Sequence, residues 1–174
     1  MKVSAAKFTG TGAGSDYRTL VDAGADPVYD FIDAGYVSTY RVRREALLDI
    51  AMTLGSEMSA TRPDVIIIEV ADGLLQRETA RLFSTQAFTD WVDGVIFAAN
   101  DALGALSGVS WLTARQLPVF AITGVLTSSP LAQREAEDIC GLPVYHTEAL
   151  ARPSVSTYVY KCLKFRRQNR MIAV

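Results

Sequence analysis

Short apolar runs alternate with longer segments of helical periodicity along most of the chain. The runs are rich in β-branched residues and read KVSAAKF, DPVYDFID, DVIIIEV, GVIFAAN, PVFAITG and PVYHT. Strands that alternate with helices are typical of βα units. We therefore predict an α/β fold in which helices cover both faces of a mostly parallel sheet. Residues 64–70 are apolar on both faces, which predicts a strand deep in that sheet.

Apolar positions between these runs predict the helices. The clearest pattern is Leu47, Ile50, Ala51, Leu54 and Met58, spaced i, i+3, i+4, i+7 and i+11. This helix is expected to end near Thr61, before Pro63. Further helices are predicted over residues 15–24, 74–83, 102–116, 130–140 and 153–170.

Two of these helices carry additional signals. Pro130 suits a first helical turn and Gly141 a C-terminal cap. The last helix is expected to place four residues on one side: Val155, Val159, Cys162 and Phe165.

Composition and charge exclude several classes of protein. The 174 residues are 49% hydrophobic and 21% charged, which is a globular balance. A net charge of -2 gives no reason to expect nucleic acid, and no apolar run approaches the roughly 18 residues of a membrane span. Cys140, Cys162 and the single His146 lack metal-ligand spacing. We predict a cytoplasmic protein with reduced cysteines; His146 is either a base or an ordinary hydrogen-bonded residue.

A glycine-rich loop follows the first predicted strand, from Lys7 to Asp16. Glycines allow successive backbone N–H groups to face an anion, hydroxyls add donors, and a lysine adds charge. The loop predicts a phosphate or substrate site with these members: Lys7, Thr9, Gly10, Thr11, Gly12, Gly14 and Ser15. Alternatively, the segment is a flexible turn that binds no ligand. A dinucleotide-binding fold with Asp33 on a ribose is also open, although G-x-G-x-x-G from Gly10 ends on Ser15.

Acidic residues follow two of the predicted strands. Glu69 and Asp72 end the run DVIIIEV, where a carboxylate can hold Mg²⁺ beside nucleotide phosphates. Alternatively, Asp72 caps a helix that starts at Gly73, and Glu69 is paired within the sheet.

The second acidic segment is DFIDAGYVSTY. Asp30 and Asp33 flank the strand end, and Ser38, Thr39 and Tyr40 add hydroxyl groups. These residues predict either substrate binding with proton transfer or ordinary turn chemistry.

Six segments together resemble a bacterial family of uncharacterised nucleotide-binding proteins whose P-loop domain is similar to dethiobiotin synthetase. They are AAKFTGTGAGSD, DAGADPVYDFIDAGYVSTY, PDVIIIEVADGLLQRET, VDGVIFAANDALGA, LPVFAITGVLTSSPLAQRE and GLPVYHTEAL. The resemblance implies a P-loop-type domain over residues 1–152. Residues 153–174 are expected to form a separate basic helix. It places Lys7 and the glycine loop over substrate and phosphates, Glu69 at Mg²⁺, and residues 123–130 near the nucleotide base.

The sequence departs from this family in two places. The family has a Walker A strand, loop and helix ahead of the matched region, whereas G-x-x-x-x-G-K-[ST] occurs nowhere here. The expected domain is thus incomplete at its N-terminus. Either the chain is shortened, another polypeptide supplies the missing elements, or hydrolysis is lost and only the substrate pocket remains. The first two are favoured because residues 64–70 need a covering neighbour.

The second departure is the basic end of the chain. It carries Lys161, Lys164, Arg166, Arg167 and Arg170. A basic helix can contact anionic lipid, nucleic acid or an acidic partner, or can simply be a solvated face.

The predicted function is a domain that binds ATP with Mg²⁺ and acts on a small carboxylate-bearing metabolite, with Asp30 and Asp33 orienting the substrate. An active enzyme would be ligase-like. A homo-oligomer, or a complex with a chain that supplies the missing elements, is expected. The alternatives are an N-acetyltransferase of the D-glutamate type and a non-enzymatic binding or assembly module.

Overall fold

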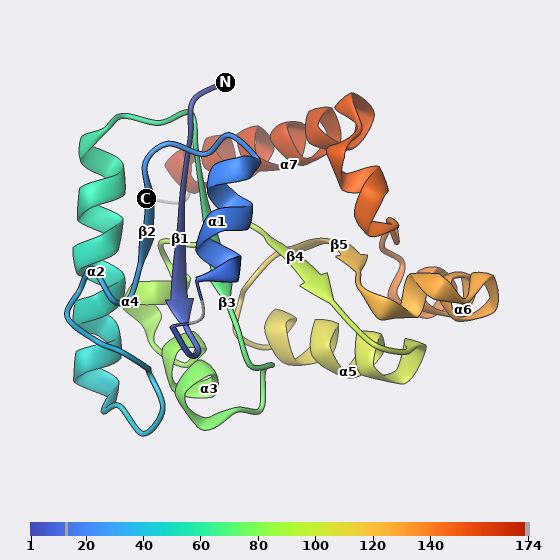
Figure 1. The fold of residues 1–174 in the computed structure, drawn as a ribbon. Coiled ribbons are helices and arrows are strands. Elements are labelled where there is room, and N and C mark those ends of the chain that lie inside the picture. Colours follow the sequence, from blue (N-terminus) through green and yellow to red (C-terminus); the bar gives the residue numbers. More distant parts are fainter. Residues whose placement is uncertain (13, 173–174) are drawn as a thin grey trace. The chain divides into compact units, whose positions relative to one another are not determined.

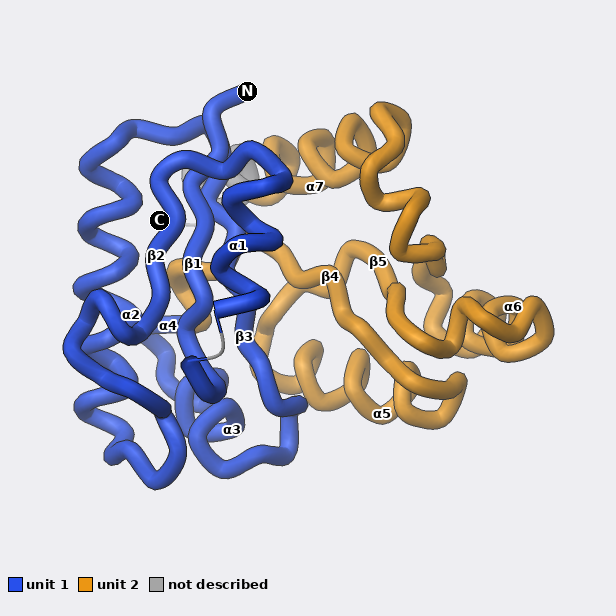
Figure 2. Tube along the Cα trace, in the orientation of Figure 1, with its two compact units in different colours: residues 1–88 blue, residues 89–174 orange. Residues whose placement is uncertain are grey.

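The chain forms two compact units, residues 1–88 and residues 89–174 (Figure 2). The structure is a computed structural model and describes residues 1–12 and 14–172, with side chains placed as far as residue 166. Both units contain parallel strands and helices, which confirms the predicted α/β class. The division at residue 88 does not test the predicted P-loop-type domain over residues 1–152.

Unit 1 is built on a three-stranded parallel sheet. Its strands are β1 (Val3–Thr9), β2 (Val28–Asp30) and β3 (Val65–Val70), in the order β2-β1-β3 (Figure 1). The central strand is therefore β1, which is buried from Ser4 onward. The prediction that residues 64–70 lie deep in the sheet is wrong for this unit. Its outer edge has no strand partner in the described part of the chain, and Ile67 is 48% exposed.

Four helices belong to this half of the chain. They are α1 (Ser15–Asp22), α2 (Arg44–Ala60), α3 (Arg77–Phe83) and, at the division between the units, α4 (Gln86–Thr89). All five predicted apolar positions of α2 are buried, which confirms that helix. The start of α3 is later than predicted because the Gln76 side chain accepts hydrogen bonds from the N–H groups of Glu78 and Thr79. Asp72 does not cap a helix at Gly73.

Unit 2 has a two-stranded parallel sheet of β4 (Val95–Ala98) and β5 (Val119–Thr123). Its helices are α5 (Ala102–Thr113), the 3-10 helix η1 (Val125–Ser128), α6 (Pro130–Cys140), the 3-10 helix η2 (Thr147–Ala151) and α7 (Pro153–Ile172). The predicted strand PVYHT is not formed. Val144 makes a single parallel bridge to Ile122, and the chain turns into η2 three residues later.

The core of unit 2 lies between α5, α6 and the sheet. Its buried members are Ala99, Ala105, Ile122, Leu126, Ala136 and Val144. The predicted signals of α6 are confirmed: Pro130 begins the helix, and Gly141 ends it in the left-handed region at φ 63°. Ser129 caps the same helix by accepting a hydrogen bond from the Ala132 N–H.

Helix α7 confirms the helix predicted from Pro153, but not all of its buried side. Val155 is buried, whereas Phe165 is 69% exposed. Tyr158 lies inward instead, where its hydroxyl donates to the Phe120 carbonyl at 3.0 Å. The side chains of Arg167 and Arg170 lie outside the described residues. No described helix is both long enough and apolar enough to cross a membrane.

Candidate functional site

A row of three charged residues crosses the sheet of unit 1 near its carboxyl edge. Lys7 of β1 lies opposite Asp30 of β2 and opposite Glu69 of β3. Paired residues of parallel strands share one face of the sheet, so the ammonium group has a carboxylate on either side. Lys7 and Asp30 are both 5% exposed. Figure 1 shows that this edge is where β1 leads into the glycine loop and where α3 begins.

The Lys7 side chain connects the row to the glycine loop. Its ammonium group forms an ion pair with Asp16, in the first turn of α1, and lies 3.4 Å from the Thr11 carbonyl oxygen. Burial lowers the pKa of Lys7, but the hydrogen bond to Asp16 and the charges of Glu69, Asp16 and Asp30 raise it overall. The hydrogen bond from Lys7 holds the pKa of Asp16 below its usual value. Lys7 is therefore firmly cationic.

The two flanking carboxyl groups are perturbed in the opposite direction. Burial raises the pKa of Asp30 and of Glu69, and the charge of Lys7 only partly offsets this effect. The charges of Asp16, Asp30 and Asp72 raise the pKa of Glu69 further. Three carboxyl groups thus share one ammonium, which leaves an excess of negative charge that a proton or a metal cation can neutralise.

Gly10 is held in the loop by internal hydrogen bonds. Its φ of 120° requires glycine, and its N–H donates to the buried Thr39 hydroxyl at 2.9 Å. The Thr39 N–H donates to the Gly10 carbonyl at 3.0 Å, and the Ser38 hydroxyl donates to the same oxygen at 3.3 Å. Gly10, Ser38 and Thr39 therefore shape the loop, and the Gly10 N–H is already used.

Thr9 is also engaged within the protein. Its hydroxyl accepts a hydrogen bond from the Ala71 N–H at 2.9 Å and lies 3.2 Å from the Ala71 carbonyl. The Thr79 hydroxyl donates to that carbonyl at 2.9 Å. These contacts fix the end of β1 against the segment that follows β3, so Thr9 positions the site.

The outer part of the loop is open. Thr11, Gly12, Gly14 and Ser15 are exposed, and the N-cap residue of α1 is Gly14, which has no side chain to cap the helix. Arg18 lies beside this segment, because a Cβ built on Gly14 would be 3.8 Å from its Nη2 atom. The sequence reading missed Arg18, although its position four residues after Gly14 places both on one side of a helix. An anion at this N-terminus would meet uncapped N–H groups and a guanidinium.

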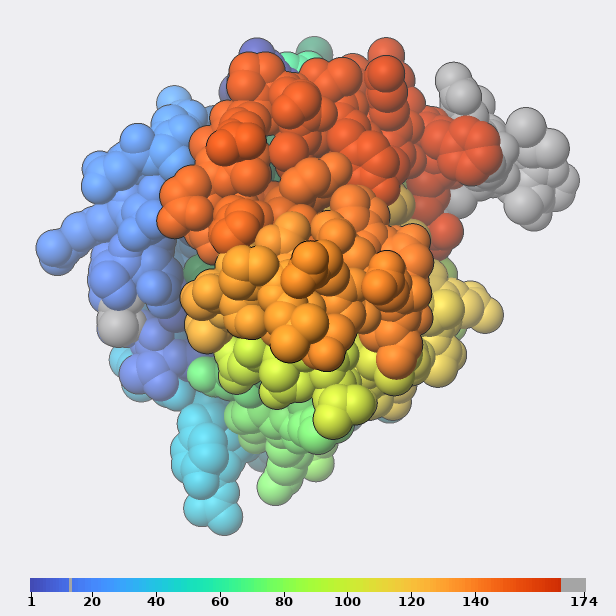
Figure 3. Space-filling model, turned by 90° about the vertical axis from the view of Figure 1, so that its right-hand side faces the viewer, coloured from blue at the N-terminus to red at the C-terminus, as the bar shows by residue number. Residues whose placement is uncertain are grey.

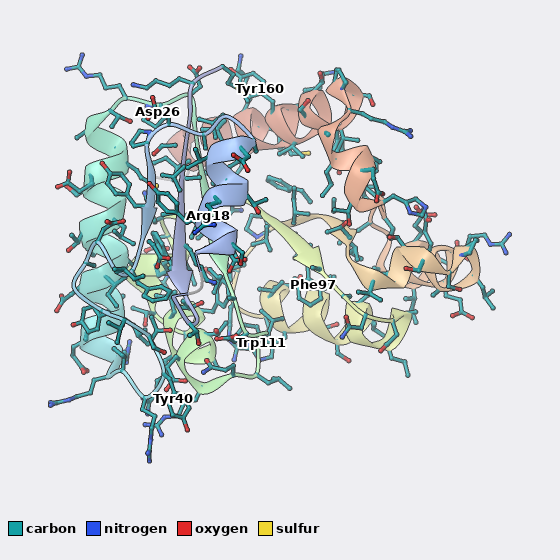
Figure 4. The ribbon with its side chains drawn as sticks, in the orientation of Figure 1. Arg18, Asp26, Tyr40, Phe97, Trp111 and Tyr160 are labelled. Atoms are coloured by element: carbon teal, nitrogen blue, oxygen red, sulfur yellow. The ribbon has the colours of Figure 1, made fainter. Side chains whose placement is uncertain are left out.

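Asp33 does not join the charged row. Its carboxylate accepts a hydrogen bond from the Asp30 N–H at 2.8 Å, which is turn chemistry. The loop beyond it carries two exposed apolar side chains, Val37 and Tyr40. Figure 4 shows Tyr40 directed away from the sheet of unit 1. The Arg41 guanidinium lies 5.9 Å from the centre of the Tyr40 ring.

The charged row has the donor chemistry for Mg²⁺ without being a complete metal site. Within residues 1–12 and 14–172, no three Asp, Glu, His or Cys side chains converge as metal ligands. Mg²⁺ is commonly held by one or two protein carboxylates together with substrate phosphates and water. Glu69 and Asp30 fit this pattern, because they carry the excess negative charge described above.

Unit 2 contains a separate cavity of about 500 Å³ at the carboxyl end of β5. Its lining includes Gly124, Thr127, Ser128, His146, Thr147 and Glu148. Gly124 has φ 105°, and a Cβ there would lie 2.6 Å from the Ala99 carbonyl oxygen. Part of the segment predicted to lie near the nucleotide base, within residues 124–130, lines this cavity, and its role in binding a base stays a prediction. His146 is an exposed member of the cavity wall.

No family model matches the chain, and no curated protein or solved structure matches it. The resemblance to dethiobiotin synthetase-like proteins stays a prediction.

Proposed function

We propose that unit 1 binds the phosphates of a nucleotide, with Mg²⁺, and a small carboxylate-bearing substrate. The observation that carries the proposal is the row Asp30, Lys7 and Glu69 at the carboxyl edge of a parallel sheet. Ligands of open α/β sheets bind beyond this edge, where the loops carry the chemistry. A cation between two carboxylates supplies both a group that binds an oxyanion and groups that bind a metal.

Each part of the row has a distinct role in the proposal. Glu69 would hold Mg²⁺, and Asp30 would hold the metal or orient the substrate. Lys7 is available to an oxyanion once Asp16 releases it, because the side-chain carboxylate of Asp16 is 39% exposed and can turn outward. Thr11, Gly12, Gly14, Ser15 and Arg18 would bind phosphate oxygens at the start of α1.

The cavity in unit 2 is a separate candidate site for a small molecule. Its volume of about 500 Å³ falls in the range of small-molecule sites. The exposed Val125 offers an apolar surface, while Ser128 and Thr147 offer hydrogen bonds.

The sheet edges favour a second candidate, a non-enzymatic assembly module. In the described residues, β3 pairs only with β1 and β4 pairs only with β5. Each strand therefore has an outer edge that could accept a further strand, and Ile67 and Ile96 are exposed there. If another segment or polypeptide added a strand with a phosphate-binding loop at one of these edges, the chain would be both an assembly module and part of a nucleotide-binding site.

Calorimetric titration with ATP and Mg²⁺ tests the proposal. We expect magnesium-dependent binding that Glu69→Gln weakens by about tenfold or more, since the variant removes one metal ligand. Asp49→Asn, at an exposed position of α2, is the matched control and should bind like the wild type. Magnesium-independent binding, or equal binding by Glu69→Gln, would reject the metal role.

Parallel titrations separate the alternatives. Binding of acetyl-CoA without ATP would favour acyl transfer, and binding of NAD would favour a dinucleotide site. If none of the three ligands binds a folded chain, the assembly module becomes the better account.

A further inference from the structure

The outward face of α7 combines aromatic and basic side chains. Tyr160 is 40% exposed and Phe165 is 69% exposed, and Lys161 and Lys164 are exposed between them. At 3.6 residues per turn, Tyr160, Lys161 and Lys164 lie on the side of the helix opposite the buried Val155, and Phe165 lies at the edge of that face. The Lys164 ammonium lies 4.8 Å from the centre of the Tyr160 ring. Figure 4 labels Tyr160 on this helix.

A hollow of complementary character lies between α5 and α6 of the same unit. It has a volume of about 380 Å³ and is lined by Ala102, Leu103, Glu135, Asp138 and Ile139. Leu103 and Ile139 are strongly exposed, as is Leu131 one turn before Glu135. Figure 3 shows α6, in orange, beside the beginning of α5, in yellow-green. The surface is an apolar floor with two carboxylates at its rim.

We infer that the α5–α6 hollow binds the outward face of α7 from a second copy of this chain. Two lysines face two carboxylates, and Tyr160 and Phe165 offer apolar surface to Leu103, Leu131 and Ile139. An amphipathic helix laid in an apolar groove is a recurrent mode of recognition. The two carboxylates of the hollow would repel an acidic partner. The overall charge of -2 on the protein disfavours binding to an anionic membrane.

Both surfaces belong to unit 2, so every copy carries a donor helix and an acceptor hollow. Reciprocal docking gives a closed dimer, whereas head-to-tail docking gives an open chain of copies. Because the contact involves one helix face and a small hollow, we expect a weak association whose affinity falls as the salt concentration rises. It does not depend on nucleotide binding in unit 1.

Charge reversal with sedimentation velocity tests the inference. The wild type should sediment faster as its concentration rises. Glu135→Lys with Asp138→Lys should weaken association by about tenfold or more, as should Lys161→Glu with Lys164→Glu. An equimolar mixture of the two variants should associate again, because each hollow then meets a helix of opposite charge. Asp49→Lys with Glu57→Lys makes the same change in charge on exposed positions of α2 and should associate like the wild type.

Several outcomes would overturn the inference. One is a wild type that stays monomeric at about 100 µM in low salt. Another is association that the hollow variant retains, or a mixture of the two variants that stays monomeric. Binding of the monomer to vesicles of phosphatidylserine, lost in the lysine variant and kept in the hollow variant, would assign the face of α7 to lipid instead.

Discussion

The two units differ in whether they bury polar side chains and in whether they contain an open cavity. Unit 1 buries charged and hydroxyl side chains at the carboxyl edge of its sheet, and internal hydrogen bonds engage many of them. Unit 2 has an almost entirely apolar core and keeps an open cavity at the end of β5. The comparison indicates that unit 1 depends on electrostatic interactions and hydrogen bonds, whereas unit 2 depends on close apolar packing around a cavity. Substitutions in the two units should therefore fail in different ways.

The largest expected effect is in unit 2, at Gly124. Gly124→Ala should destabilise the protein by about 3–4 kcal/mol, because φ 105° is strained for alanine and the new Cβ would meet the Ala99 backbone. Urea unfolding followed by circular dichroism measures the loss.

Gly141→Ala is the matched control, since Gly141 also has positive φ but nothing lies within 4 Å of the added Cβ. It should cost only about 1 kcal/mol. Equal losses at both glycines would mean that the close packing of Gly124 contributes nothing.

The next effect is in unit 1, at Lys7. Lys7→Met should cost about 2–3 kcal/mol at neutral pH, because it leaves the Asp30 and Glu69 carboxylates without their cation. The loss should shrink near pH 4, where these groups take up protons. Thermal unfolding at the two pH values measures it, and a loss independent of pH would contradict the electrostatic role of Lys7.

A smaller effect is expected at the loop. Thr39→Val should cost about 1–2 kcal/mol, because the buried Gly10 N–H loses its acceptor. Ser38→Ala removes a 3.3 Å bond to a carbonyl that has another donor and the acceptor of the exposed Tyr40 N–H, and should cost less. Hydrogen exchange of the Gly10 amide should accelerate in the first variant and not in the second.

The smallest effect has the opposite sign. The pKa of Glu69 is raised in the folded state, so its contribution to stability is full below its ordinary pKa and is lost as pH rises through the raised value. Glu69→Gln should therefore increase stability slightly at neutral pH and change little near pH 4. A loss of stability at neutral pH would show that the carboxylate is favourably paired.

Periodicity and end signals predicted the local elements well. The five apolar positions of α2 and the Pro130 and Gly141 boundaries of α6 depend on neighbours within the helix, so the sequence displays them directly. Phe165 was predicted on the buried side of α7 from its i+3 spacing to Cys162, but it is exposed. This spacing is also compatible with a position at the edge of the buried side, so it does not distinguish the two. The strand predicted at PVYHT reduces to one bridge, since a β-branched run does not reveal how many partners it finds.

The sequence showed which charged residues lie near strand ends, but not which contacts they make. Lys7 and Glu69 were identified from their positions near strand ends, and the sheet register does bring them together with Asp30. The bond from Gly10 to Thr39 joins residues 29 positions apart, and no local pattern encodes it. Whether β3 lies at the edge of its sheet depends on the other strands that pair with it. The apolar residues on both faces of residues 64–70 therefore could not show that it is an edge strand.

Amide chemical-shift mapping with triphosphate and Mg²⁺ tests the proposed phosphate site of unit 1 most directly. Triphosphate with Mg²⁺ should shift the amides of Thr11, Gly12, Gly14 and Ser15 in unit 1, and should leave those of residues 124–128 and 146–148 in unit 2 unshifted. Shifts confined to α7 on addition of triphosphate, with none in the glycine loop, would contradict the phosphate site.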